Sequence, residues 1–226
     1  MITLAFELSA SPASLALAQN ETILAQCAWQ TDTTGGRDLF SRLDGLLERA
    51  GVGPEKIERY AVGLGPGSYS GLRMALAAAR AMALPGKQPL YGLPSPLLAA
   101  RELTRTHSFP SIALVGDARR QRCWLARFAC RQPGEPVMDG PIRLASWPEL
   151  PDHLQGMAAV ATPHWPALAP RLKSSAPATA HVWEEPAVPS AATACLLAPR
   201  LGQEDRPDAP LAPLYLHPPP PYAHAR

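Results

Sequence analysis

A glycine-rich turn between an apolar strand and an alanine-rich helix constrains this chain most. Residues 57–64 form an apolar run of strand length, and residues 70–84 consist mainly of alanine, leucine and methionine. Between them stands the segment GPGSYSG, residues 65–71. Because glycine permits close backbone approach, this pattern predicts a tight strand-to-helix turn on which the following helix packs closely.

The spacing within this turn excludes three familiar motifs. In the dinucleotide fingerprint G-x-G-x-x-G the third glycine would come one residue before Gly71. A P-loop needs lysine and then serine or threonine after its last glycine, whereas Leu72 and Arg73 follow here. A nucleophile elbow needs glycines two residues to either side of its serine, and neither Ser68 nor Ser70 has them. Two interpretations of the turn remain: it binds an anion at the helix N-terminus, or it has a purely structural role.

Hydrophobic periodicity predicts an alternating series of strands and helices. Apolar runs at 2–8, 13–19 and 22–29 are separated by short polar turns, as in an antiparallel meander. Gly51 marks the end of a helix expected over 37–50. Further strands are expected at 57–64, 88–92, 111–116 and 123–129, and further helices at 70–84 and 96–106. The order β-β-β-α-β-α-β-α indicates an α/β fold with a mixed sheet and crossover helices.

The distribution of proline divides the chain. Residues 141–226 hold 17 of the 27 prolines, so short elements and long connections are expected there. We predict a first lobe over residues 1–106 and a second, proline-rich lobe over 107–217. Residues 218–226 begin with four consecutive prolines and are expected to form a disordered tail.

The charge balance argues against a broad nucleic-acid surface. The chain has 21 basic and 19 acidic residues, for a net charge of +2, whereas phosphate binding needs clustered lysine and arginine. A local RNA-contacting patch is the alternative, and its candidates are Arg119, Arg120, Arg122, Arg127 and Arg131.

The cysteine pattern and the apolar segments favour a cytoplasmic protein. The four cysteines form no C-x-x-C pair, which is typical of free thiols in a reducing compartment. Glu7 interrupts the first apolar run, so a signal peptide is not expected. No uncharged apolar stretch approaches the roughly 20 residues that a transmembrane helix needs, so no membrane association is expected.

The alanine-rich helix at 70–84 predicts contacts on more than one side. It lacks a polar stripe, and a helix without one is covered by more than one neighbour. One neighbour is the sheet. The other could be the helix at 37–50 together with a partner chain, or the rest of the same domain.

The turn resembles a specific family signature. Residues 65–73, GPGSYSGLR, resemble the G-P-G-S-F/Y-T/S-G-L-R segment of the TsaB (YeaZ) family, the dimerization subunit of the bacterial tRNA threonylcarbamoyladenosine complex, often labelled glycoprotease-like. The resemblance extends to the segment DARR at 117–120 and to PLYL at 213–216. It is weak between residues 130 and 205.

The resemblance implies an actin-like (ASKHA, ribonuclease-H-like) fold of two small lobes, in a subunit that performs no catalysis and has no cofactor of its own. It implies a catalytic paralogue of the TsaD family as partner, with ATP and metal bound there, in the threonylcarbamoylation of tRNA adenosine 37. An ATPase subunit is expected as a further partner, tRNA contact would be indirect, and the isolated chain is expected to form a homodimer.

The resemblance also implies that the two helices of the first lobe hold the partner. The residues expected at this interface are Arg37, Leu39, Phe40, Leu43, Leu47, Ser68, Tyr69, Leu72, Arg73, Leu76 and Arg80. No metal site is expected, because the six histidines lie at least seven residues apart and metal-binding helices use closer pairs. No serine, histidine and acid set has spacing that supports a protease.

The first hairpin departs from the family pattern. An I-D-T-S type stretch is usual, whereas residues 6–9 read FELS. An ATP-using enzyme of the sugar-kinase and actin superfamily is therefore kept as an alternative, with Glu7 and Asp117 as its candidate carboxylates. The nucleotide-facing candidates are Glu7, Ser9, Gly65 and Gly67.

Overall fold

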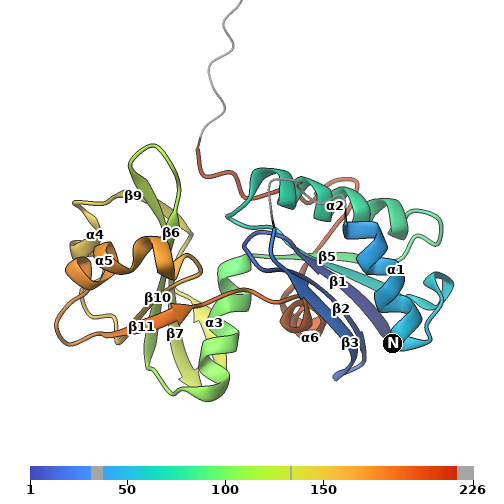
Figure 1. Cartoon of the computed structure of the whole chain (residues 1–226), viewed down its shortest axis with the longest axis horizontal. Helices are drawn as coiled ribbons and strands as arrows, with labels where there is room; N and C mark the ends of the chain where they lie inside the picture. The colour runs from blue at the N-terminus through green and yellow to red at the C-terminus, as the bar shows by residue number, and fades with distance from the viewer. Residues whose placement is uncertain (32–37, 133, 218–226) are drawn as a thin grey trace, which may run out of the picture.

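Both halves of the chain follow the same order of elements, β-β-β-α-β-α-β-α (Figure 1). The computed structural model describes residues 1–31, 38–132 and 134–217. The first half contains β1 (Ile2–Glu7), β2 (Ala13–Gln19), β3 (Thr22–Trp29), α1 (Leu39–Ala50), the 3-10 turn η1 (Pro54–Lys56), β4 (Arg59–Gly63), α2 (Tyr69–Ala83), β5 (Leu90–Leu93) and α3 (Ser95–Thr106). The predicted elements of residues 1–106 are confirmed, with ends shifted by up to two residues.

The second half repeats the series with shorter helices and two extra strands, β9 and β12. It contains β6 (Ser111–Asp117), β7 (Arg122–Gln132), β8 (Glu135–Met138), β9 (Arg143–Ser146), α4 (Leu150–His153), β10 (Ala159–Thr162), α5 (Trp165–Ser175), β11 (His181–Pro186), α6 (Ala191–Leu201) and β12 (Gln203–Glu204). The tail predicted for 218–226 lies outside the described residues.

The two sheets share one topology. The first has the order β12-β5-β4-β1-β2-β3 and the second β11-β10-β6-β7-β8, with β9 paired beside β7. In both sheets the first three strands pair antiparallel. The fourth strand, β4 or β10, then pairs parallel with the first, and the fifth, β5 or β11, pairs parallel with the fourth. Strands β1 and β2 are almost wholly buried, which explains their continuous apolar runs, whereas the edge strand β3 alternates between exposed and half-buried residues.

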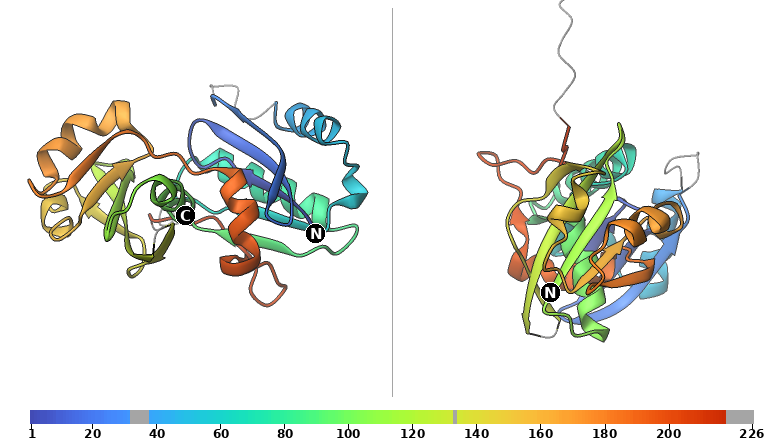
Figure 2. Two further views of the ribbon diagram at one scale, coloured as in Figure 1. Left: turned by 90° about the horizontal axis from the view of Figure 1, so that it is seen from below. Right: turned by 90° about the vertical axis from the view of Figure 1, so that its left-hand side faces the viewer.

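Helices α3 and α6 are exchanged between the lobes. Helix α3 follows the first sheet but packs on β6, β7 and β8, whereas α6 follows the second sheet but packs on β1, β2, β4 and β5. The two helices also contact each other between the lobes (Figure 2). One apolar cluster therefore runs through both lobes, from Ala5 and Ala61 through Leu98 and Cys195 to Phe128.

Two further apolar clusters lie on the outer faces of the sheets. Helices α1 and α2 cover the outer face of the first sheet, on the side opposite α6 (Figure 1). Helices α4 and α5 cover the outer face of the second sheet, where Leu150, Leu154, Leu168 and Leu172 are buried. Each sheet is thus covered on both faces, as sheets with crossover helices require.

The final segment of the described chain returns to the first lobe, which corrects the predicted lobe boundary. Strand β12 pairs with β5 of the first sheet. Leu211 is buried in the cluster beneath α2, and the Leu214 backbone N–H donates to the Leu64 carbonyl at 2.8 Å. Residues 191–217 were assigned to the second lobe from proline content, which carries no information about the sheet on which a helix packs.

A partly buried ion pair fastens this segment to α2. The Arg80 guanidinium donates to both carboxylate oxygens of Asp205, at 2.7 and 2.9 Å, and to the Leu211 carbonyl at 2.6 Å. Asp205 also accepts from the Leu211 backbone N–H at 2.7 Å. Hydrogen bonds from Arg80, opposed in part by burial, hold the pKa of Asp205 below its ordinary value.

Replacing Asp205 with asparagine is expected to lower the free energy of unfolding at neutral pH by about 1–2 kcal/mol, since a two-pronged charged contact is lost from a partly exposed site. Because the folded-state pKa of Asp205 is lowered, its contribution is complete above the pKa of the unfolded chain and disappears as pH falls through the folded value. Urea unfolding at several pH values measures both effects. Asp208→Asn is the control, because Asp208 is 78% exposed and lies 3.9 Å from Arg206; an equal loss there would contradict the role of Asp205.

Candidate functional site

The glycine turn rests directly on the turn between β1 and β2. A Cβ atom at Gly67 would overlap the Ser9 carbonyl, and one at Gly71 would overlap the Leu8 carbonyl. The Ser68 backbone N–H donates to the Ser9 carbonyl at 2.7 Å. The Ser68 hydroxyl in turn accepts from the Gly71 backbone N–H at 3.2 Å and caps α2. The glycines are therefore required by close contact between two turns.

Glu7 joins three elements beneath this turn. Its carboxylate, 1% exposed, accepts from the Ser9 backbone N–H at 2.7 Å and from the Ser95 hydroxyl at 2.8 Å. The Ser95 hydroxyl also accepts from the Gly65 backbone N–H at 3.0 Å. Burial raises the pKa of Glu7, and the bonds from Ser9 and Ser95 oppose that effect. The structure thus gives the nucleotide-facing candidates Glu7, Ser9 and Gly65 internal partners, while Gly67 packs on Ser9.

The space between the lobes beside Glu7 is largely filled. A cavity of about 10 Å³ lies there, and its lining includes Ser95, Trp124, Pro163, His164 and Pro189. That volume suits one water at most. Burial lowers the pKa of His164, with Asp117 opposing the effect.

The outer face of α1 and α2 is the candidate interface, and the structure divides its predicted residues into two groups. The leucines are buried in the core of the first lobe, each 1–7% exposed: Leu39, Leu43, Leu47, Leu72 and Leu76. All of them except Leu72 belong to the apolar cluster on the sheet of their own lobe, so they support this face from within, and their direct contact with a partner stays a prediction. Arg80 is bound to Asp205 instead, and Arg37 lies outside the described residues.

The exposed side of α2 forms a ridge at four-residue spacing. This α2 ridge consists of Tyr69, Arg73, Ala77 and Ala81, all exposed. Only one of its four residues is charged, although solvent-facing helix positions are usually polar. Phe40 on α1 is 59% exposed and extends the apolar character of this face, and Ser68 is exposed at the start of α2.

The C-terminal segment adds a second aromatic ring to the ridge. The Arg73 guanidinium lies 4.2 Å from the Tyr69 ring centroid, and its Nε donates to the Tyr215 hydroxyl at 2.9 Å. The two tyrosine rings lie 5.4 Å apart, and Tyr215 is 47% exposed. Tyrosine and arginine are enriched at the energetic centres of interfaces. Tyr215 was missed as a site residue, because no local pattern places it beside a helix 140 residues away.

The predicted arginine patch does not gather at one place. Arg122 and Arg131 lie nine residues apart on β7, a separation of about 30 Å along an extended strand. Arg119 pairs with Asp117 at 3.5 Å and Arg127 with Asp139 at 3.3 Å.

Three consecutive residues of the β6–β7 turn adopt left-handed backbone conformations. Arg119, Arg120 and Gln121 have φ values of 63°, 51° and 60°. Each such L-residue costs roughly 1–2 kcal/mol, so the turn is strained. The Asp117 carboxylate accepts from the Arg119 backbone N–H at 2.8 Å and holds the turn in place.

The chemistry of the remaining groups is limited by burial. All four cysteines are free thiols. Burial raises the pKa of Cys123 to about 11 and also raises that of Cys195, so neither supplies a thiolate near neutral pH.

Within the described residues, no group of three or more histidine, cysteine, aspartate or glutamate side chains is placed to hold a metal ion. No helix in that part of the chain is long and apolar enough to cross a bilayer.

Comparisons with known proteins identify the fold. A family model described as TsaD, tRNA N6-adenosine threonylcarbamoyltransferase, matches residues 37–135, a range that includes the glycine turn. YeaZ from Pseudomonas aeruginosa has a TM-score of 0.71 at 20% identity, with 88% of this chain and 90% of that chain covered. The chain has the YeaZ fold. The predicted resemblance and the α/β fold of two lobes with mixed sheets and crossover helices are confirmed at this level.

A second solved structure supports the YeaZ fold over nearly the whole chain. It is a Pseudomonas aeruginosa protein described as similar to the peptidase YeaZ, with a TM-score of 0.77 at 20% identity. The match covers 96% of this chain and 99% of that chain. A search of curated protein sequences gives no significant match.

Substituting Glu7 with glutamine tests the buried carboxylate. Because burial raises the folded-state pKa of Glu7, the unmodified protein loses stability as pH rises from the pKa of the unfolded chain to the folded value. The glutamine variant lacks this loss, so its free energy of unfolding relative to the unmodified protein is expected to increase as pH rises above the pKa of the unfolded chain. Glu149→Gln is the control. Hydrogen bonds from Ser146 lower the pKa of Glu149, so the free energy of unfolding of this variant relative to the unmodified protein should change with pH in the opposite direction. A pH-independent difference for Glu7→Gln would contradict this assignment.

Replacing Gln121 with glycine tests the strain in the β6–β7 turn. Glycine adopts a φ of 60° without a steric penalty from Cβ. The free energy of unfolding of the variant is therefore expected to be about 1 kcal/mol higher than that of the unmodified protein. Chemical denaturation measures the change. Gly140→Ala, at a φ of 82°, should change stability in the opposite direction, and a destabilised Gln121→Gly would refute the strain.

Proposed function

We propose that this chain is a non-catalytic scaffold subunit that binds a TsaD-type catalytic partner through the outer face of α1 and α2, in the threonylcarbamoylation of tRNA adenosine 37. The YeaZ fold and the match to the TsaD family model support this class of assembly. The observation that carries the proposal is the α2 ridge, an exposed helix surface with a single charge.

The duplicated fold provides an internal comparison for this surface. Helix α5 occupies in the second lobe the place that α2 occupies in the first. Its exposed residues include Pro166, Pro170, Arg171 and Lys173, which suit contact with water. The exposed residues of α2 are Tyr69, Ser70, Arg73, Ala77 and Ala81, with a single charge among them. The two lobes therefore differ in surface chemistry, and the first lobe is favoured as the docking side.

The buried leucines support the face from beneath. Leu43 and Leu76 fix α1 and α2 on the sheet, while Ala77 and Ala81 let a partner helix approach closely. A stable interface buries on the order of 1,600 Å² in total, which needs more than one helix from each chain. Phe40 and the Tyr69–Arg73–Tyr215 cluster supply the larger contact groups.

In this assembly the catalytic partner supplies ATP and metal binding, and this chain contributes surface. The carboxylate nominated for a nucleotide enzyme, Glu7, is already bonded to Ser9 and Ser95, which supports the scaffold role over the ATP-using alternative. The free thiols are consistent with a reducing cytoplasm. We further propose an ATPase subunit as third component, indirect contact with tRNA, and homodimerisation through the same face when the partner is absent.

Charged substitutions on the α2 ridge test the partner interface. Tyr69→Asp and Ala81→Glu are expected to abolish co-purification with the TsaD-type partner, since loss of a central contact costs about 2 kcal/mol or more. The free energy of unfolding should change by about 0.5 kcal/mol or less for Ala81→Glu, because Ala81 is exposed, and by more for Tyr69→Asp, which also loses the contacts with Arg73 and Tyr215. Val137→Asp is the matched control, an exposed apolar residue of the second lobe with 60% exposure.

The same variants test homodimerisation. Light scattering of the isolated protein should show a dimer for the unmodified chain and for Val137→Asp, and a monomer for Ala81→Glu. Normal capture of the partner by both ridge variants would contradict the proposed face.

A further inference from the structure

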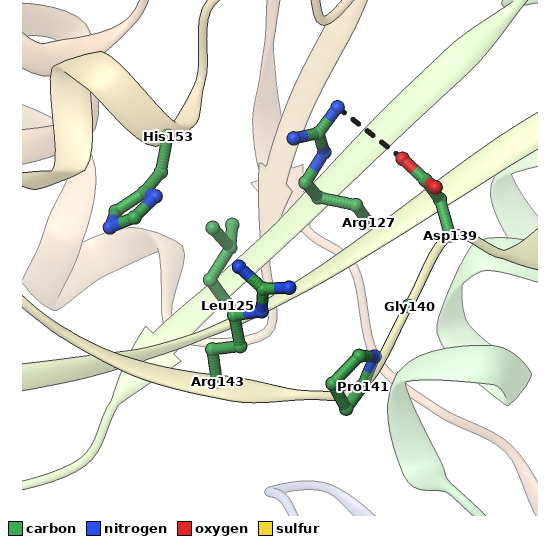
Figure 3. Close-up of a pocket in the computed structure, with 7 residues that line it drawn as sticks. All are labelled: Leu125, Arg127, Asp139, Gly140, Pro141, Arg143 and His153. Atoms are coloured by element: carbon green, nitrogen blue, oxygen red, sulfur yellow. Dashed lines mark ion pairs between the residues drawn. The ribbon is translucent and has the colours of Figure 1, made fainter.

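A pocket of about 150 Å³ opens on the outer side of the second lobe (Figure 3). Its floor is Leu125 of β7, and its walls include Arg127 of β7, Arg143 of β9 and His153 of α4. Asp139, between β8 and β9, stands at the opposite side from His153 (Figure 3). The pocket lies on the other lobe from α1 and α2, so it is separate from the proposed partner interface (Figure 1).

The strand register brings the two arginines together. Arg143 of β9 pairs directly with Leu125 of β7, and Arg127 lies two residues further along β7. Residues two apart on a strand share a face, and diagonal neighbours on paired strands are within reach of long side chains. Figure 3 accordingly shows the Arg127 and Arg143 side chains over Leu125 in one pocket.

The charges in the pocket are not balanced. Arg127 and Arg143 carry one positive charge each, whereas Asp139 is the single carboxylate in the lining. Asp139 lies 3.3 Å from a terminal nitrogen of Arg127. Arg143 has no ion pair within the described residues, and the Nε of Arg127 is buried without a hydrogen-bond partner there. Two guanidinium groups that share a pocket repel each other unless an anion lies between them.

We propose that this pocket binds a phosphate group. Guanidinium groups present several fixed N–H donors that match the oxygens of phosphate, and His153 adds a donor from a third direction. Donors from three sides suit a tetrahedral anion better than a planar carboxylate. The ligand is either a small phosphorylated molecule or a backbone phosphate of a nucleic acid, and one phosphate group fills the same place in both.

Titration with inorganic phosphate, followed by NMR on the full chain at constant ionic strength, tests the site. Phosphate should shift the signals of Leu125 and His153, and Arg143→Gln should weaken binding about tenfold or more through loss of a charged hydrogen bond. Asp139→Asn should strengthen binding, because it removes the carboxylate that competes for Arg127. Arg131→Gln, on the same strand but outside the pocket lining, should bind phosphate like the unmodified chain.

Binding of fluorescent tRNA to the same variants distinguishes the two sources of phosphate. Arg143→Gln could weaken tRNA binding and also reduce, by about one, the slope of log affinity against log salt concentration. In that case the bound group is a backbone phosphate. If Arg143→Gln weakens only the binding of inorganic phosphate, the ligand is a small phosphorylated molecule. The absence of phosphate-induced shifts, weaker binding by Asp139→Asn, or an equal loss in Arg131→Gln would overturn the proposal.

Discussion

The buried contact between Glu7, Ser95 and the Gly65 backbone holds the first lobe in its arrangement. It joins the end of β1, the glycine turn before α2 and the first residue of α3. Helix α2 is thereby set on the outer face of the sheet, and α3 is directed toward the second lobe. A carboxylate with 1% exposure is costly unless hydrogen-bonded, and here two donors satisfy it. The position of the candidate interface and the joining of the lobes both follow from this contact.

Local pattern was enough to predict the elements of residues 1–106 and the first two strands of the second lobe. Apolar periodicity and the glycine stop at Gly51 located the elements of the first lobe, because strand and helix periods depend on neighbouring residues alone. The return of α6 and the pairing of Arg80 with Asp205 could not be predicted, since the two residues lie 125 positions apart. The burial of the α1 and α2 leucines within their own lobe could not be predicted for a related reason. An apolar stripe looks the same whether its own sheet or a partner covers it.

The duplication explains why the two lobes can serve different purposes. Both use one strand order and exchange one helix, so the central cluster fixes them together. The outer faces are then free to diverge. The first lobe carries long helices with a nearly uncharged ridge, whereas the second carries the four-residue α4 and the arginine-lined pocket beside it.

The exchange of α6 also sets the order in which the protein can be made. The Cys195 thiol lies 3.5 Å from the carbonyl of Thr3, so nearly the full length of the polypeptide separates two groups that touch. Until α6 has been synthesised, the inner face of the first sheet has no helix to cover it. The N-terminal half must therefore wait, partly exposed, for the C-terminal end to emerge, and contacts of such long sequence separation form slowly.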